Sequence, residues 1–172
     1  TGRDNLGFAD YANFVSSYPD FPKTDVLRRR AEAAIERSAP SPADLRRYFD
    51  KAPPLTNAGR TKHALALASE RRDALPAARA AWRGGSMSGP DELFLAGLYE
   101  SKFTAEDNRA RMNALLWQGD AAGAARQILR ISENERSIFM ARLALVQGQS
   151  PEAAGLMVLG EALADAGYVY NL

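Results

Sequence analysis

Residues 104–148 read TAEDNRARMNALLWQGDAAGAARQILRISENERSIFMARLALVQG, and this stretch decides the fold class. It contains two capping-box patterns, in which a hydroxyl residue is followed three positions later by an acid. Thr104 with Asp107 forms the first pattern, and Ser132 with Glu135 forms the second. Each pattern predicts that an α-helix begins at the next residue.

Both predicted helices carry apolar residues at helical spacing and stop at a glycine. Gly119 ends the first and Gly148 ends the second, while Asp120 is placed to cap a short helix between them. A spacing of three to four positions puts apolar side chains on one face of a helix. These positions are Ala110, Ala114, Leu115 and Trp117, then Ala124, Ala125, Ile128 and Leu129, then Ile138, Phe139, Leu143 and Val146.

The two helices that end in glycine belong to a weak internal sequence repeat. The pattern that returns 29 to 30 residues later is Ala114-Leu115…Gly119…Ala124-Ala125, matched by Ala144-Leu145…Gly148…Ala153-Ala154. A period of about 30 residues is typical of a two-helix unit. Because the earlier chain has the same rhythm without a clean period, we expect irregular stacked hairpins.

The rest of the chain has the same character. Good helix formers (Ala, Leu, Arg and Glu) dominate, and alternating β-branched runs do not occur. Further helices are predicted over residues 6–16, 24–37, a segment capped by Ser41 with Pro42 in its first turn, 57–68, 73 or 75 to 82, 90–101 and 150–167. We therefore predict an all-α fold of about ten helices, in which stacked antiparallel hairpins form an α-solenoid or superhelix. We expect it to be a single domain over residues 1–172.

The composition is that of an ordinary folded chain. Of 172 residues, 46% are hydrophobic and 25% are charged, with a net charge of +1, which gives no reason to expect a nucleic-acid partner. The absence of cysteine excludes disulfides and thiolate metal sites. No apolar run approaches the ~20 residues needed to span a bilayer, so no transmembrane segment is expected. The chain starts at Thr1 without a signal core, so either a leader was removed or the sequence is a piece of a longer chain.

A resemblance to a known family rests on residues 103–120, FTAEDNRARMNALLWQGD, followed by Ala124-Ala125-Arg126. This stretch is similar to the helical region of soluble lytic murein transglycosylases, in which a helix ends in a Trp-x-Gly type of turn and an Ala-Ala-Arg helix follows. Three shorter segments are compatible with it: YPDFP at 18–22, WRGG at 82–85 and AGYVY at 166–170. Tetratricopeptide-like arrays share the helix-Gly-helix rhythm.

The resemblance implies a cell-wall function. Enzymes of this family cleave the β-1,4 link between N-acetylmuramic acid and N-acetylglucosamine in peptidoglycan and leave a 1,6-anhydro product. Their catalytic Glu lies in a separate lysozyme-like domain with a Glu-Ser and a Gly-Leu-Met-Gln motif, and the superhelical region carries no catalytic residue. We therefore expect this chain to be the scaffold of a periplasmic enzyme without its catalytic domain. Its expected partners are peptidoglycan or that missing domain, with a protein partner also possible.

Two segments look like the catalytic motif and are rejected. Glu100-Ser101 and Gly155-Leu156-Met157-Val158 lie 54 to 55 residues apart, far more than in the family's motif. Val158 also replaces the family's Gln. A solvated acid at the end of a helix is the simpler interpretation of Glu100.

No other residue is assigned to catalysis, to a cofactor or to a metal. His63 is the only histidine, and a half-buried polar role is favoured over a role as a base. Glu106, Asp107 and the acids at 133–135 fall at helix starts, where the helix dipole explains them. The Gly-rich residues 84–89 predict a turn. Core packing is favoured over sugar stacking for Tyr48, Trp82, Tyr99, Trp117 and Phe139, and a solvated face is favoured for Arg28, Arg29, Arg30, Arg46, Arg47, Arg71 and Arg72.

Two other functions stay open. One is a tetratricopeptide-like module that binds a peptide in a groove. The other is a small intact enzyme that uses Glu100, which release of muropeptides from sacculi would reveal.

Overall fold

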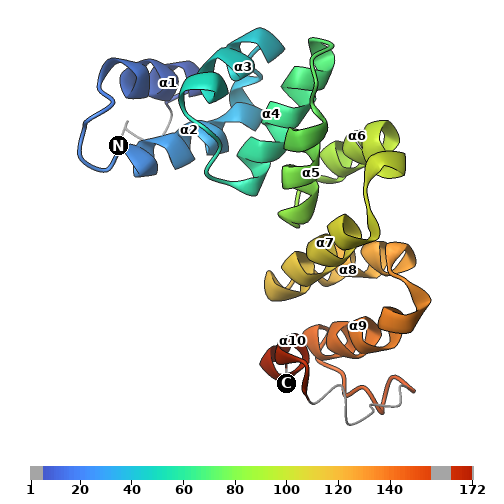
Figure 1. Cartoon of the computed structure of the whole chain (residues 1–172). Helices are drawn as coiled ribbons and strands as arrows, with labels where there is room; N and C mark the ends of the chain where they lie inside the picture. The colour runs from blue at the N-terminus through green and yellow to red at the C-terminus, as the bar shows by residue number, and fades with distance from the viewer. Residues whose placement is uncertain (1–5, 156–163, 172) are drawn as a thin grey trace. The chain divides into compact units, whose positions relative to one another are not determined.

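The computed structural model describes residues 6–155 and 164–171, and its regular elements in those residues are all helices (Figure 1). This confirms the predicted all-α class, whereas the solenoid arrangement stays a prediction. The α-helices are α1 (Phe8–Ser17), α2 (Thr24–Ser38), α3 (Pro42–Lys51), α4 (Asn57–Ser69), α5 (Leu75–Arg83), α6 (Gly89–Tyr99), α7 (Ala105–Trp117), α8 (Ala121–Gln127), α9 (Glu133–Val146) and α10 (Ala166–Asn171). Two short 3₁₀ helices, η1 (Glu100–Lys102) and η2 (Ile128–Arg130), follow α6 and α8.

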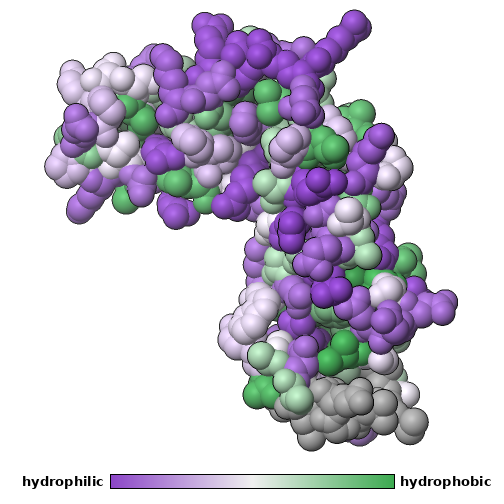
Figure 2. Space-filling view, in the orientation of Figure 1, coloured by the Kyte–Doolittle hydropathy of each residue, from purple (hydrophilic) through white to green (hydrophobic). Residues whose placement is uncertain are grey.

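The chain forms two compact units. The first contains Thr1–Ala81 and Met87–Glu100, and the second contains Trp82–Ser86 and Ser101–Leu172. The single domain expected over residues 1–172 stays a prediction. Hydrophobic residues reach the surface at separate places among hydrophilic ones (Figure 2).

The core of the first unit lies where α1 packs on α2 and α3 packs on α4. Its rings meet edge to face, because the Phe8 and Tyr48 centroids are 5.1 Å apart at an interplanar angle of 79°. Its buried members are Phe8, Tyr11, Ala31, Ala34, Ile35, Leu45, Tyr48, Phe49 and Ala66. The apolar spacing in the sequence therefore marks the faces of α1, α2 and α3 that are buried.

A buried acid connects this core to the loop before α4. Glu32 of α2 is 3% exposed, and its carboxylate accepts the backbone N–H groups of Leu55 and Thr56, each at 2.7 Å. The Thr56 hydroxyl also donates to it. Gly59 leaves the room that the carboxylate occupies, since an added Cβ there would lie 2.4 Å from Glu32 Oε2. Charge-assisted hydrogen bonds of this kind are about twice as strong as neutral ones.

An ion-pair cluster connects three helices of the same unit. Lys62 Nζ of α4 lies 2.6 Å from Glu36 Oε1 of α2 and 2.9 Å from Asp91 Oδ1 of α6. Burial alone would lower the pKa of Lys62, but its hydrogen bonds to the two carboxylates raise that pKa above its ordinary value. The lysine is therefore charged and holds α2, α4 and α6 together.

The second unit is built on α7, α8 and α9, with α10 packed against α9. Its main core consists of Met112, Leu115, Leu116, Ala124, Ile131 and Phe139. A smaller cluster joins Ala141 of α9 to Tyr168 of α10.

Both predicted helix starts are confirmed, at Ala105 and Glu133, but only the first of the two capping boxes forms. At α7, the Asp107 N–H donates to Thr104 Oγ1 at 3.1 Å, and the Thr104 N–H donates to Asp107 Oδ2 at 2.9 Å. At α9, the Ser132 hydroxyl instead donates to Glu135 Oε2 at 2.6 Å and makes no cap. The Glu135 carboxylate also pairs with Arg109 Nε at 2.9 Å, which draws it away from the backbone of the helix start.

Two turns end α7 and α9 in the same way. After α7, the Asp120 N–H donates to the Leu115 carbonyl at 2.9 Å, and the Gly119 N–H donates to the Leu116 carbonyl at 3.2 Å. Corresponding groups repeat the pattern after α9 around Gly148. This Schellman motif needs a left-handed residue, and φ is 71° at Gly119 and 74° at Gly148. The predicted glycine stops are confirmed.

The last predicted helix, over residues 150–167, is wrong at its start, and α10 continues past its predicted end near Gly167 to Asn171. Residues 151–155 form turns, in which the Ala153 N–H donates to Ser150 Oγ at 3.0 Å and Gly155 takes a left-handed φ of 75°. A left-handed φ does not fit a regular helix, so the helix predicted from Ser150 does not form over residues 151–155. Residues 156–163 lie outside the described residues, and α10 begins at Ala166.

Asp120 makes the stability of the second unit depend on pH. It caps α8 by accepting the Gly123 N–H at 2.8 Å, and it accepts the Ser86 hydroxyl at 2.7 Å. Burial raises the pKa of Asp120, but these hydrogen bonds and the positive charges of Arg126 and Arg111 lower it below its ordinary value.

Because the folded pKa is lowered, this contribution is complete above the pKa of the unfolded chain, about 4. It is lost as pH falls through the folded pKa. We expect the free-energy difference between wild type and Asp120→Asn to shrink below about pH 4. Urea unfolding followed by tryptophan fluorescence measures it, since Trp82 and Trp117 both belong to the second unit. A difference that stays constant from pH 7 to about pH 2 would contradict the assignment.

Candidate functional site

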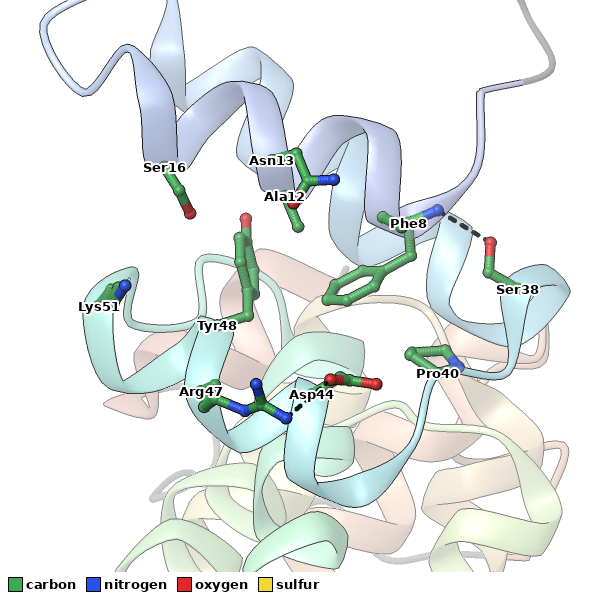
Figure 3. Close-up of a pocket in the computed structure, with 11 residues that line it drawn as sticks. Phe8, Ala12, Asn13, Ser16, Ser38, Pro40, Asp44, Arg47, Tyr48 and Lys51 are labelled. Carbon is green, nitrogen blue, oxygen red and sulfur yellow. Dashed lines mark hydrogen bonds and ion pairs between the residues drawn. The ribbon is translucent and has the colours of Figure 1, made fainter.

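A pocket in the first unit lies between α1 and α3 (Figure 3). Its volume is about 330 Å³, near the lower end of the range for small-molecule sites. The apolar wall comes from Phe8, Ala12 and the ring of Tyr48, while Asn13 and Ser16 add polar groups from α1. The Ser38 hydroxyl closes one end by accepting the Phe8 N–H at 2.9 Å. The pocket is therefore apolar on one side and polar on the other.

The Tyr48 hydroxyl is the buried polar group of this pocket. Tyr48 is 6% exposed, and its hydroxyl has no hydrogen-bond partner among the described residues. Burial, helped by the charge of Glu32 and opposed by Arg28, raises the pKa of Tyr48 to about 12. The group therefore keeps its proton at neutral pH and remains a hydrogen-bond donor.

The charged residues of the pocket sum to one positive charge. Arg47 Nη2 pairs with Asp44 Oδ1 at 3.2 Å, and the Asp44 Oδ2 atom accepts the Ser41 hydroxyl at 2.7 Å. Lys51 lines the pocket and makes no ion pair with any described residue. The acid is thus already occupied and one cation is available.

A second feature is an exposed aromatic pair in the second unit. The ring centroids of Trp117 on α7 and Tyr170 on α10 are 3.7 Å apart with an interplanar angle of 42°. Trp117 is 48% exposed and Tyr170 is 61% exposed. The prediction of core packing is therefore wrong for Trp117, because α7 turns this residue away from the core that contains Leu115 and Leu116.

A buried arginine holds this pair in place. Arg142 of α9 is 2% exposed and donates to Asn113 Oδ1 at 2.6 Å and to Asn171 Oδ1 at 3.1 Å. It therefore joins α9 to α7 and to α10. Burial lowers the pKa of Arg142, and the nearby charge of Asp165 opposes this. Gly167 allows the close approach, since an added Cβ there would lie 2.4 Å from the guanidinium carbon.

None of the residues considered for catalysis lines the pocket or belongs to the aromatic pair. Glu100 is exposed in η1, as the interpretation of a solvated helix-end acid predicts. Of the second rejected motif, Gly155 is an exposed turn residue, and residues 156–158 lie outside the described residues. His63 is half-buried, with its ring 5.3 Å from that of Phe49. Burial lowers the pKa of His63, against the charge of Asp50.

Of the remaining aromatic candidates, three are buried in the core as predicted and one is only half-buried. Trp82 is 0% exposed, Phe139 is 5% exposed and Tyr48 is 6% exposed, so core packing is confirmed for them. Tyr99 is only half-buried. The Trp82 ring stacks on Phe103 at 4.8 Å and its Nε1–H donates to Asn108 Oδ1 at 3.0 Å.

Many of the arginines on the predicted charged face are paired with acids. Arg28 lies 3.1 Å from Asp25 Oδ1, and Arg46 Nε lies 2.6 Å from Glu70 Oε2. Arg72 lies farther from the same carboxylate, at 3.7 Å. This pairing supports a solvated face over a binding site for an anionic polymer.

The other sequence candidates have structural roles. Part of the Gly-rich loop is anchored, because the Ser86 N–H donates to Gln118 Oε1 and the Gln118 side-chain amide donates to the Gly84 carbonyl, both at 2.9 Å. Glu106 pairs with Arg109 at 3.5 Å. Among the described residues, no group of three or more His, Cys, Asp or Glu side chains is arranged to hold a metal ion.

Comparisons with known proteins were made at three levels. Models of protein families, curated proteins and solved structures each gave no match to this chain. Every helix in the described part of the chain is too short or too polar to cross a lipid bilayer.

Sequence reasoning did not find either of these two features. In the sequence Tyr170 is one residue of the short segment AGYVY, and nothing in its spacing indicates that it contacts Trp117. The Tyr48 hydroxyl looks like that of any core tyrosine. Its only sequence signal is a position beside two cations, Arg47 and Lys51, on α3.

Proposed function

We propose that this chain is the helical scaffold of a periplasmic lytic murein transglycosylase, and that Trp117 and Tyr170 contact a peptidoglycan glycan strand. Support comes first from the resemblance, because Trp117 lies within the 103–126 segment that carries it. The exposed pair of rings is the observation that carries the binding role. A lysozyme-like domain of the family's kind would supply the cleavage.

The chemistry of the pair suits a sugar. The axial C–H groups of a pyranose ring form an apolar face, which packs on an aromatic ring, while the sugar hydroxyls remain in water. Trp and Tyr combine a large apolar surface with one polar group, and they lose little conformational freedom when they bind. Since α10 is held by Arg142 through Asn171 at 3.1 Å, the two rings are ordered before the glycan arrives. Such preorganisation reduces the entropy lost on binding.

Replacing Trp117 by alanine is expected to weaken binding of the chain to peptidoglycan by about tenfold, because the stacking surface is removed. Tyr170→Ala is expected to have a similar effect. Co-sedimentation of the whole chain with purified sacculi measures the affinity. With soluble glycan fragments, tryptophan fluorescence reports Trp117 directly, because the other tryptophan, Trp82, is 0% exposed.

The control is Leu129→Ala, because Leu129 is an apolar side chain of the same unit that is 79% exposed and is not part of the aromatic pair. It is expected to bind as the wild type does. The proposal is wrong if wild type does not sediment with sacculi, or if Leu129→Ala and Trp117→Ala lose affinity equally.

A peptide-binding module of the tetratricopeptide-like kind is the second candidate, and the surface of α6 favours it. Leu93, Phe94 and Leu98 are 75%, 65% and 54% exposed. Phe94 and Leu98 also line a hollow of about 570 Å³ with Leu65 of α4. Apolar surface of this kind often marks a site for a protein partner. Peptide binding without glycan binding would favour this function over the first.

A further inference from the structure

We propose that the pocket between α1 and α3 binds a small organic carboxylate, whose charged group accepts a hydrogen bond from Tyr48 and whose apolar part packs on Phe8 and Ala12. The site belongs to the first unit, and the aromatic pair of the proposed function belongs to the second. The two proposals therefore stand or fall separately.

The unpartnered hydroxyl is the first reason. Buried polar groups nearly always have a hydrogen-bond partner. Tyr48 is 6% exposed, yet its hydroxyl has none among the described residues. In Figure 3 the hydroxyl points up toward α1, at the end of the pocket where Ser16 lies. A ligand atom that accepts a hydrogen bond would satisfy it.

The balance of donors and charge identifies the ligand as an anion. Lys51 and Tyr48 each have a donor available, and Ser16 adds a hydroxyl at the same end of the pocket (Figure 3). The one acid, Asp44, is already engaged by Arg47 at 3.2 Å and by Ser41 at 2.7 Å. Lys51 is exposed and hydrated in the free protein, and its positive charge attracts an anion and repels a cation.

The size and the apolar wall identify the anion as organic. A volume of about 330 Å³ exceeds what a bare inorganic ion fills, and the Phe8 ring with the Ala12 methyl group offers a surface that only an apolar group covers well. The same chemistry is found in a free carboxylic acid and in the C-terminus of a short apolar peptide.

The experiment titrates the whole chain with three probes and follows backbone amide signals by NMR. The probes are benzoate, N-acetyl-alanyl-alanine and the C-terminal amide of that dipeptide. Both carboxylates are expected to shift signals from α1 and α3, and the amide is expected to bind at least about tenfold more weakly, because it lacks the charge. Whichever of benzoate and the dipeptide binds with the higher affinity shows whether the pocket prefers a free carboxylic acid or a peptide C-terminus.

Tyr48→Phe tests the hydroxyl. We expect affinity for the carboxylates to fall by about tenfold, because a hydrogen bond to a charged group is lost. The fold is expected to persist, since the hydroxyl bonds no other described residue, and thermal unfolding checks this. Tyr18→Phe is the matched control, because Tyr18 is 58% exposed and does not line the pocket. Lys51→Gln is compared in the same way with Arg29→Gln on the exposed side of α2.

Three results would overturn the proposal. The first is no shift with either carboxylate up to about 10 mM. The second is equal affinity for the dipeptide and its amide. The third is unchanged affinity in Tyr48→Phe relative to Tyr18→Phe, which would mean that the hydroxyl does not bond the ligand.

Discussion

Alanine in place of Glu32 is expected to lower the free energy of unfolding of the first unit by about 4 kcal/mol. The carboxylate accepts two backbone N–H groups, those of Leu55 and Thr56, and the Thr56 hydroxyl. Each donor left buried without a partner costs about 1–3 kcal/mol. The substitution also leaves a cavity beside Gly59. The loop between α3 and α4 is therefore expected to lose its attachment to α2.

Hydrogen–deuterium exchange measures this effect unit by unit, with faster exchange expected in α2, α3 and α4. The control is Glu36→Ala on the same helix, because the Glu36 side chain is 67% exposed and its ion pair among the described residues is with Lys62 at 2.6 Å, which retains its other pair with Asp91 at 2.9 Å. A surface ion pair contributes about 0–1 kcal/mol. If both variants exchange at the same rate, Glu32 does not hold the loop.

Arg111→Ala is expected to destabilise the second unit by about 3–5 kcal/mol. Arg111 of α7 is 0% exposed, and its guanidinium lies 4.2 Å from the centre of the Trp82 ring. Its Nη1 donates to the Gly85 carbonyl at 2.6 Å. Alanine removes the cation–π contact and that hydrogen bond, and it leaves a large cavity.

Urea unfolding followed by tryptophan fluorescence measures the loss, because both tryptophans lie in this unit. Arg111→Met separates the two causes, since it retains most of the packing volume and lacks the charge. The free energy of unfolding of Arg111→Met is expected to lie between that of the wild type and that of Arg111→Ala. Arg109→Ala is the control: that side chain is 46% exposed and pairs with Glu106 and Glu135, so its effect is expected to stay below about 1 kcal/mol. Equal midpoints for Arg111→Ala and Arg109→Ala would contradict this account.

Local chemistry explains what sequence reasoning predicts well. A cap such as Thr104 and a stop such as Gly119 act on backbone groups within a few residues, so the sequence alone shows them. The same holds for Ser41, which accepts the Asp44 N–H at 3.2 Å. The helix class and most helix starts follow from such signals. The capping box at Ser132 does not form because its partner, Glu135, also pairs with Arg109. A local sequence pattern does not show that competition.

Burial of polar groups could not be predicted, because it depends on contacts between distant residues. Arg111 and Arg109 look alike in the sequence, yet only Arg111 is buried against Trp82. Trp82 and Trp117 are equally apolar, and only the packing of α7 decides that the second is exposed. The sequence holds one indication that Glu32 is buried, because it lies between Ala31 and Ala34 on the apolar face of α2.

The matching turns at Gly119 and Gly148 have a consequence for how this chain can change in length. They lie 29 residues apart, and both use the same pair of backbone hydrogen bonds with nearly the same φ. If the segment from Asp120 to Gly148 were duplicated, each copy would therefore begin after and end with a turn of a type that the chain already makes. The second unit can therefore accept a tandem duplication at this site, in which each added copy contributes one more pair of helices.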